Sequence, residues 1–318
     1  MFSNKKIIFF IEYVWLLVLL LLACLFYLSQ QTISLFFNSD LLIIPSLFKD
    51  IFINNNHYKD WFLSPAPHFF PDMVLYLPTI YLFKQIYLQF LAYICLILLL
   101  TYFIVKHTYR LFFSKNNSTF FALTAISSLF VLAFTLISPY MFFMVPATHY
   151  GEFIMGLLLI IITTKMISNR KFNFKKYVEY SISVLLILAC SASDLLFIIQ
   201  FVIPIFLSYI IIYLKKYIQF SRFVLLSALC IVPSVIGGLL SKYIVPHQIL
   251  FEYLAPSAQK ISLHTVIIQV SAFLNTIKIA IKYRPGYVFP IFYLCICFMV
   301  GIILLNKEKL KNFHLKKK

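Results

Sequence analysis

The sequence predicts an all-α fold: a polytopic bundle of transmembrane helices with about eight spans, and at most ten. Of the 318 residues, 62% are hydrophobic and 12% are charged, whereas soluble domains contain about 45–50% apolar and about 25% charged residues. Several apolar runs reach the length of about 18–20 residues with which a helix crosses the hydrocarbon core of a bilayer. These runs are continuous rather than alternating, which favours helices over membrane-spanning strands.

Eight apolar runs are the predicted spans. The first follows the basic start Lys5–Lys6 and shows no small-residue cleavage site, so we interpret it as a retained helix rather than a signal peptide. The fifth and sixth runs are separated only by Ser193 and Asp194, which predicts a tight helical hairpin, with one bent helix as the alternative. The predicted spans are 7–28, 86–105, 119–138, 151–168, 178–192, 195–214, 223–244 and 286–305.

Lysines and arginines lie mainly in alternate connections between these spans. The positive-inside rule assigns such connections to the cytoplasm, here the N-terminus, the segments 106–115, 170–176 and 215–222, and the basic tail 306–318. We therefore expect a multi-pass protein of a bacterial inner membrane with both termini in the cytoplasm. The net charge of +17 follows from this placement, so it does not indicate a nucleic-acid partner.

The whole chain, 1–318, is predicted as one integral membrane domain with two long loops on the outer face, 29–85 and 245–285. Each loop contains a segment with apolar residues on one helical face, 41–52 in the first and 261–284 in the second. This pattern is typical of amphipathic helices that lie in the membrane interface.

A third apolar segment of the first loop, 69–83, contains Pro78 and is short for a span. We expect a helix that lies on the outer leaflet or dips into it. The alternative is a ninth span, which would place the basic segment that follows residue 105 outside, against the positive-inside rule.

The aspartates gather on the predicted outer face or at its edge, although acidic residues contribute little to topology. Ionisable groups next to a bilayer are costly and usually mark function. We therefore take Asp40 and Asp72 as candidate catalytic carboxylates that accept a proton from a hydroxyl. The candidate substrate-binding residues are Asp60, Trp61, His68, His149, Asp194, Lys278, Lys282 and Arg284.

Each candidate also has a structural interpretation. Asp40 and Asp72 precede apolar helices and suit N-caps, although the prolines and aromatic residues of PAPHFFPD would hold Asp72 and His68 on a rigid ledge. Asp194 suits a hairpin turn or a partnership inside the bundle. His149 begins a helix and suits phosphate binding or acid catalysis.

The remaining candidates also have structural interpretations beside the functional ones. Asp60 and Trp61 in YKDW suit an anchor at headgroup depth. The three basic residues of the second loop suit either a substrate phosphate or anionic lipid headgroups. Asp40 and Asp72 are also the candidate ligands of a divalent metal ion, because hard cations bind carboxylates and phosphates; no other cofactor is indicated.

The layout resembles the GT-C class of integral-membrane glycosyltransferases. It combines one N-terminal helix, a long outer loop with an early aspartate (Asp40 in NSD) and a second acid (Asp72 in PDM), then a bundle of apolar helices; the likeness covers residues 1–220. The resemblance implies a polyprenyl-phosphate sugar donor, an acidic catalytic residue in the first loop, and transfer to an envelope glycan, lipid or protein at the outer face of the inner membrane.

Two other functions stay open at this point. A transporter or flippase of a lipid-linked or amphiphilic substrate would use a similar membrane groove without chemistry, and a non-catalytic assembly subunit would need none of the outer acids. For the glycosyltransferase, the expected partners are a lipid-linked sugar donor and membrane lipids. For the transporter, they are its lipid-linked or amphiphilic substrate and membrane lipids. The sequence does not predict the oligomeric state.

Overall fold

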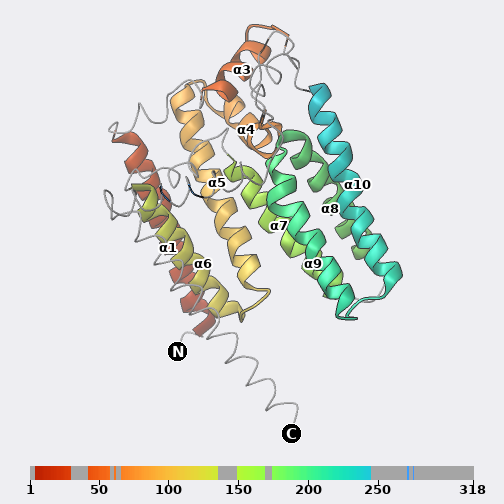
Figure 1. The fold of residues 1–318 in the computed structure, drawn as a ribbon. Helices are drawn as coiled ribbons and strands as arrows, with labels where there is room; N and C mark the ends of the chain where they lie inside the picture. Colours follow the sequence, from red (N-terminus) through yellow and green to blue (C-terminus); the bar gives the residue numbers. More distant parts are fainter. Residues whose placement is uncertain are drawn as a thin grey trace. The chain divides into compact units, whose positions relative to one another are not determined.

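The computed structural model describes residues 4–29, 42–57, 61, 66–134, 149–168, 174–244, 271 and 275. These residues form α-helices and two short π-helical segments and contain no strand, which confirms the all-helical prediction. The elements are α1 (Asn4–Leu28), α3 (Ile43–Phe52), η2 (Phe69–Met73), α4 (Val74–Leu82), α5 (Ile86–Tyr109), α6 (Lys115–Phe134), α7 (Tyr150–Ser168), α8 (Phe174–Ser193), η4 (Ile198–Val202), α9 (Ile203–Leu214) and α10 (Phe220–Ile244) (Figure 1).

The chain separates into two compact units, Met1–Gln248 and Ile249–Lys318. All the helices named above lie in the first unit, and the following description concerns that unit alone. In the second unit the structure describes only Ser271 and Asn275, both helical. The predicted amphipathic helix 261–284 and the predicted last span therefore lie, apart from these two residues, outside the described part of the chain.

Four helices are long and apolar enough to cross a membrane, which supports a membrane-embedded protein. Their apolar stretches are Phe10–Leu28, Ile86–Tyr109, Tyr150–Ile167 and Phe220–Ser241. Helices α6, α8 and α9 coincide with three more of the predicted runs, but their apolar stretches are shorter. The positions of the helices thus agree with the sequence prediction, whereas the count of about eight spans is not confirmed.

Apolar side chains on the outside of the bundle fit a lipid surrounding. Leu17 and Leu25 on α1 are 56% and 64% exposed, and Val232 on α10 is 53% exposed. Soluble proteins rarely present such apolar surface continuously. Inside, α5 contributes to both buried clusters: Phe90, Ile94 and Leu98 pack with α1 and α6, while Tyr93 and Ile97 pack with the helices on its other side.

Small residues let α8 and α10 approach closely. A Cβ atom added to Gly237 of α10 would lie 2.6 Å from the backbone oxygen of Leu188 on α8. The same Cβ atom would lie 2.8 Å from the Cβ of Ser191, which is buried on α8. Close backbone approach through small residues is a common way for helices to associate in membranes, where burial of apolar surface drives association only weakly.

The predicted break at Ser193–Asp194 separates two helices. Helix α8 ends at Ser193, Asp194 is not helical, and η4 and α9 follow. At the far end of α9, a short connection leads into α10, and Arg222 donates hydrogen bonds of 2.5 and 3.0 Å to the backbone oxygens of Met166 and Ile167, near the end of α7. The chain therefore reverses direction after Asp194, as expected for a hairpin rather than for one bent helix.

The predicted first loop, 29–85, contains the two expected helical segments. Helix α3 buries Ile44, Leu47 and Phe48 on one face, as its amphipathic pattern predicts. The segment 69–82 is helical through η2 and α4, and is one of the shorter apolar helices. Tyr76 of α4 is fully buried against α5, where its hydroxyl donates to Gln89 Oε1 at 3.0 Å.

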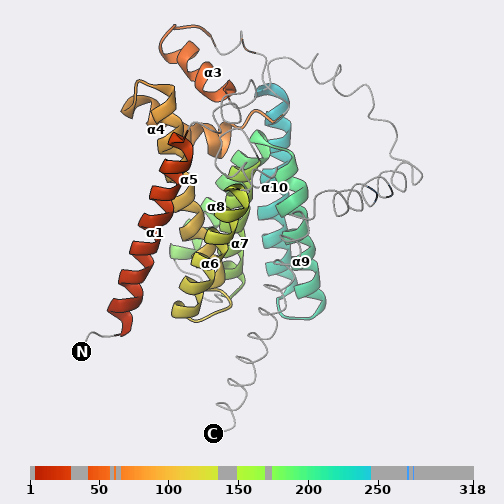
Figure 2. The same cartoon turned by 90° about the vertical axis from the view of Figure 1, so that its left-hand side faces the viewer.

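Charged residues divide between the two ends of the bundle. Figures 1 and 2 show the helices that form these ends from two sides. The end that carries α3, α4 and the start of α7, here called the acidic end, has Asp50, Asp72, Glu152 and Asp194, together with Lys49 and Lys84. The opposite, basic end has Lys106, Arg110, Lys165, Lys215, Lys216 and Arg222, together with Glu12 and Glu179. The aspartates among the described residues thus share one end, as predicted.

Candidate functional site

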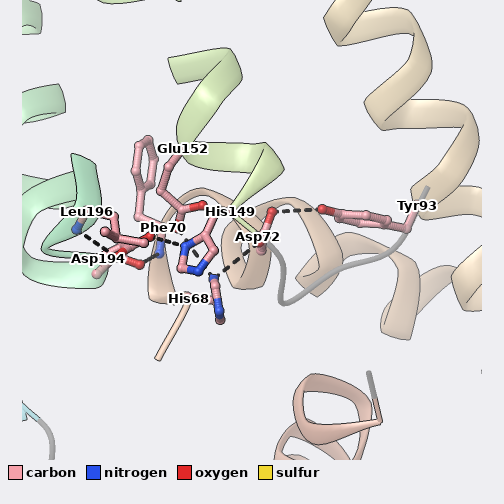
Figure 3. Close-up of polar contacts among 9 residues, drawn as sticks. His68, Phe70, Asp72, Tyr93, His149, Glu152, Asp194 and Leu196 are labelled. Carbon is pink, nitrogen blue, oxygen red and sulfur yellow. Dashed lines mark hydrogen bonds and ion pairs between the residues drawn. The ribbon is translucent and has the colours of Figure 1, made fainter. Parts of the chain in front are cut away.

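Five ionisable side chains meet at the acidic end, and we call them the acid–histidine cluster: His68, Asp72, His149, Glu152 and Asp194 (Figure 3). They come from three separate parts of the chain: the segment that opens η2, the start of α7, and the turn after α8. Four of them are buried, whereas the side chain of His149 is 48% exposed. The cluster therefore reaches the surface at His149.

The local backbone fixes His68. This residue has φ 56° and ψ 32°, in the left-handed region, which costs a non-glycine residue of order 1–3 kcal/mol. The next turn is π-helical, with Met73 N–H donating to His68 O at 3.1 Å, and contains the cis Phe70–Pro71 peptide. Phe70 N–H donates to Ser193 Oγ at 3.1 Å and so ties this segment to the end of α8.

Asp72 is fully buried and lies against two helices. Its Oδ1 accepts a hydrogen bond of 2.8 Å from the Tyr93 hydroxyl of α5. A Cβ atom on Gly151, in the first turn of α7, would lie 2.3 Å from the same oxygen, so only glycine permits this approach. The residues at the N-cap positions of η2 and α4 are His68 and Met73, so Asp72 occupies neither cap position.

Glu152 was not among the residues predicted from the sequence. It lies in the first turn of α7, where the helix dipole favours a negative charge. Its side chain is 1% exposed, and neither carboxylate oxygen makes a hydrogen bond to another described residue. The nearest basic atom is His68 Nδ1, 3.5 Å from Oε1. The one sequence signal for Glu152 was its position three residues after His149, on the same helical face.

Asp194 takes part both in the hairpin turn and in a pair inside the bundle, the two roles considered from the sequence. Its Oδ1 accepts from Leu196 N–H at 2.9 Å, which orders the turn, while its Oδ2 bonds to His149 Nδ1. This hydrogen bond raises the pKa of His149, whereas burial lowers the pKa of His68. The two rings lie 5.5 Å apart. Neighbouring titratable groups whose pKa values move in opposite directions are typical of acid–base sites.

The structure brings together four of the predicted site residues, namely His68, Asp72, His149 and Asp194. Trp61 is described but lies elsewhere: its Nε1 donates to Asp50 Oδ2 at 2.8 Å, at the end of α3. The other predicted site residues lie outside the described part of the chain: Asp40, Asp60, Lys278, Lys282 and Arg284.

Two sets within the cluster have the residue types and spacing of metal ligands. One is His68, Asp72 and Glu152; the other is His149, Glu152 and Asp194. In each set the ligand atoms lie within 4.8 Å of one another. The sequence prediction named Asp72 with Asp40 as candidate ligands; Asp72 belongs to the first set.

An apolar groove of about 340 Å³ lies between α7 and the segment formed by η4 and α9. It begins at Gln200 and Phe201, a few residues after Asp194, and its lining extends to Ile167 and Ile212 toward the basic end. Gly156 makes room for the Phe201 ring at this end of the groove, because a Cβ atom there would lie 2.2 Å from the ring. On α7, the groove lining begins at Ile160, eight residues after Glu152 of the cluster.

We compared the chain with protein-family models, curated proteins and solved structures, and none of them matches it.

Proposed function

We propose that this protein is a membrane glycosyltransferase that moves a sugar from a polyprenyl-phosphate donor to an envelope glycan, lipid or protein acceptor. The observation that carries the proposal is the acid–histidine cluster at one end of an apolar helical bundle. A lipid-linked sugar phosphate keeps its tail in the bilayer and its head at the surface. Its reaction site therefore belongs where ionisable groups meet the apolar helices.

The His149–Asp194 pair suits the proton transfer that this reaction needs. With Nδ1–H donated to Asp194, Nε2 of the half-exposed ring is available to an acceptor hydroxyl. Asp194 then orients the ring and stabilises the imidazolium, as the acid does in a catalytic triad. The acceptor oxygen bonds to the anomeric carbon, its proton passes to His149, and the polyprenyl phosphate leaves with the electron pair of the broken bond.

The predicted catalytic carboxylates keep a place in this scheme. Asp72 is held beside the pair by Tyr93, as a fixed negative charge within the cluster. Asp40 belongs to the first loop and is the further acid that the resemblance implies. Stabilisation of the departing phosphate also requires a cation or oriented hydrogen-bond donors.

The groove between α7 and α9 supports a lipid-linked substrate. Its lining is mostly aliphatic and aromatic, including Ile160, Phe201 and Ile205. A prenyl chain lying there would extend toward the turn that carries Asp194. The division of charge between the two ends, with the positive-inside rule, supports placing the cluster at the outer face of a bacterial inner membrane.

The test uses purified full-length protein in lipid nanodiscs, incubated with lipid-linked sugars extracted from bacterial membranes and with envelope acceptors. The wild type should form a glycosylated product detectable by mass spectrometry, and Asp194→Asn should form about 100-fold less. Asp50→Asn is the matched control, since Asp50 is an aspartate at the same end but bonds only to Asn54, Asn56 and Trp61 in the contacts seen here. Equal product from Asp194→Asn and the wild type would contradict the proposal.

Transport of a lipid-linked substrate is the second candidate, and the groove itself favours it, since a groove can guide a lipid chain without chemistry. Vesicles containing the protein and a fluorescent prenyl phosphate distinguish the two functions. Movement of the lipid across the vesicle membrane without new product supports the transporter. If no product forms and the lipid does not move, the result supports the non-catalytic assembly subunit.

A further inference from the structure

We propose that His68, Asp72 and Glu152 form a binding site for one divalent transition-metal ion, with Zn²⁺ as the best fit. The three side chains converge from η2 and the first turn of α7, with each ligand atom within 4.8 Å of the others (Figure 3). This inference concerns binding and does not rest on glycosyl transfer.

The donor set selects the class of metal. One imidazole nitrogen and two carboxylates match the ligands of Zn²⁺, which binds histidine and acidic residues in four-coordinate sites. Ca²⁺ and Mg²⁺ prefer sites made of oxygen ligands alone. Three protein ligands also leave a fourth position for water or a substrate oxygen, as in catalytic zinc sites.

The distances fit ligands arranged around a shared ion. His68 Nδ1 lies 3.7 Å from Asp72 Oδ2 and 3.5 Å from Glu152 Oε1. Both separations are too long for hydrogen bonds. Two ligands bonded at about 2.0–2.1 Å to a tetrahedral ion are about 3.3–3.4 Å apart. A small inward movement of these side chains would therefore complete the coordination.

The strongest indication is a buried acid that makes no hydrogen bond to another described residue. Glu152 is 1% exposed at its side chain, and its two oxygens make no hydrogen bond to another described residue. His68 Nδ1 is likewise buried without a hydrogen bond within the described part of the chain. No described lysine or arginine pairs with Glu152. Buried polar groups are normally hydrogen-bonded, and buried charges are normally paired or bound to metals.

The surrounding residues hold the ligands in place. Tyr93 donates to the Oδ1 of Asp72, the oxygen that does not face His68. Gly151 lets that carboxylate reach α7, and the left-handed backbone fixes His68. Hydrogen bonds from a second layer of residues orient metal ligands in this way. His149 and Asp194 bond to each other and so lie next to the proposed ion rather than among its three ligands.

The test measures metal on purified full-length protein in detergent, without any substrate. After chelation and dialysis, Co²⁺ is added as a spectroscopic probe and Zn²⁺ as a competitor. We expect one Co²⁺ per chain with the visible absorption of a four-coordinate site, displaced by one equivalent of Zn²⁺. Glu152→Gln and His68→Gln should weaken binding by at least about 100-fold, and Tyr93→Phe by about 10-fold.

Asp50→Asn, which removes a carboxylate outside the cluster, should bind as the wild type does. His68→Gln alters a strained backbone position and could prevent folding. In that case, the binding measured for Glu152→Gln decides the test. Absence of a Co²⁺ spectrum from folded wild type, or equal binding by Glu152→Gln, would overturn the site. Because no substrate is present, this result is independent of whether the protein transfers sugar.

Discussion

Two of the buried carboxylates in the bundle, those of Glu12 and Glu152, have different surroundings. At the basic end, Glu12 of α1 forms a direct ion pair with Lys106 of α5, whose ammonium also lies 5.4 Å from the centre of the Tyr102 ring. At the acidic end, Glu152 is more deeply buried, and its one ion-pair partner among the described residues is His68, at 3.5 Å. Glu12 is satisfied within the protein, whereas the described residues leave Glu152 unsatisfied.

This difference shows why burial of a charge alone does not indicate function. Glu12 and Lys106 neutralise each other and connect two helices, which is a structural role. The carboxylate of Glu152 costs free energy in its present surroundings, and such a cost persists where a bound ion or substrate requires it. Four changes, ordered from the largest to the smallest expected effect on stability, test this contrast.

The first change breaks the satisfied pair. Glu12→Gln leaves the Lys106 ammonium buried without its anion, so we expect the free energy of unfolding to fall by about 3–5 kcal/mol. The double variant Glu12→Gln with Lys106→Met should recover most of this loss. Unfolding in mixed micelles of increasing denaturing-detergent content measures both, and wild-type stability in the single variant would show that the pair contributes nothing.

The second change tests the approach of Asp72 to α7. Gly151→Ala would place a Cβ atom 2.3 Å from Asp72 Oδ1, and we expect a loss of about 1–3 kcal/mol from overpacking. Gly238→Ala on α10 is the matched control, because its Cβ would meet Leu195 at an ordinary 3.5 Å. Replacing a helical glycine by alanine without a steric clash should raise the free energy of unfolding by about 0.5–1 kcal/mol. Equal thermal stability of the two variants would contradict the described geometry.

The third change removes the unsatisfied acid. Glu152→Gln loses no hydrogen bond to another described residue and removes a buried ionisable group. In metal-free protein we therefore expect the free energy of unfolding to rise by about 0.5–2 kcal/mol, the opposite of the Glu12 result. The same micelle titration measures it. A loss as large as that of Glu12→Gln would mean that Glu152 also has a structural role.

The smallest effect concerns Asp50 at the end of α3. Hydrogen bonds from Asn54, Trp61 and Asn56 lower the pKa of this carboxyl. Its contribution to stability is therefore complete above its ordinary pKa of about 3.9 and is lost as the pH falls through the lower value of the folded state. The stability difference between wild type and Asp50→Asn should shrink as the pH falls below about 4. A difference that does not change with pH would refute this assignment.

The sequence predicted the helices better than the site. Long apolar runs specify helices locally, so most helix positions follow directly from composition and the break at Asp194 was visible as two polar residues. The gathering of acids at one end was also visible, because few acidic residues interrupt the apolar runs. His68, Asp72, His149 and Asp194 were identified on that basis.

The contacts within the site were not visible. Asp72 meets Gly151, and His149 meets Asp194, across long stretches of chain, so no local pattern encodes either contact. Glu152 resembles an ordinary acidic residue in the first turn of a helix. Trp61 was predicted as a substrate-binding residue, but its indole nitrogen is bonded to Asp50.

Mass spectrometry of envelope glycans and glycolipids tests the central contrast most directly. The experiment uses cells from which the native protein has been deleted. These cells express either Glu152→Gln or the Glu12→Gln, Lys106→Met double variant, and each variant is present in the membrane at the wild-type level. We predict that the double variant restores the glycan product and that Glu152→Gln does not. Wild-type amounts of product with Glu152→Gln would show that the unsatisfied carboxylate has no part in the protein's function.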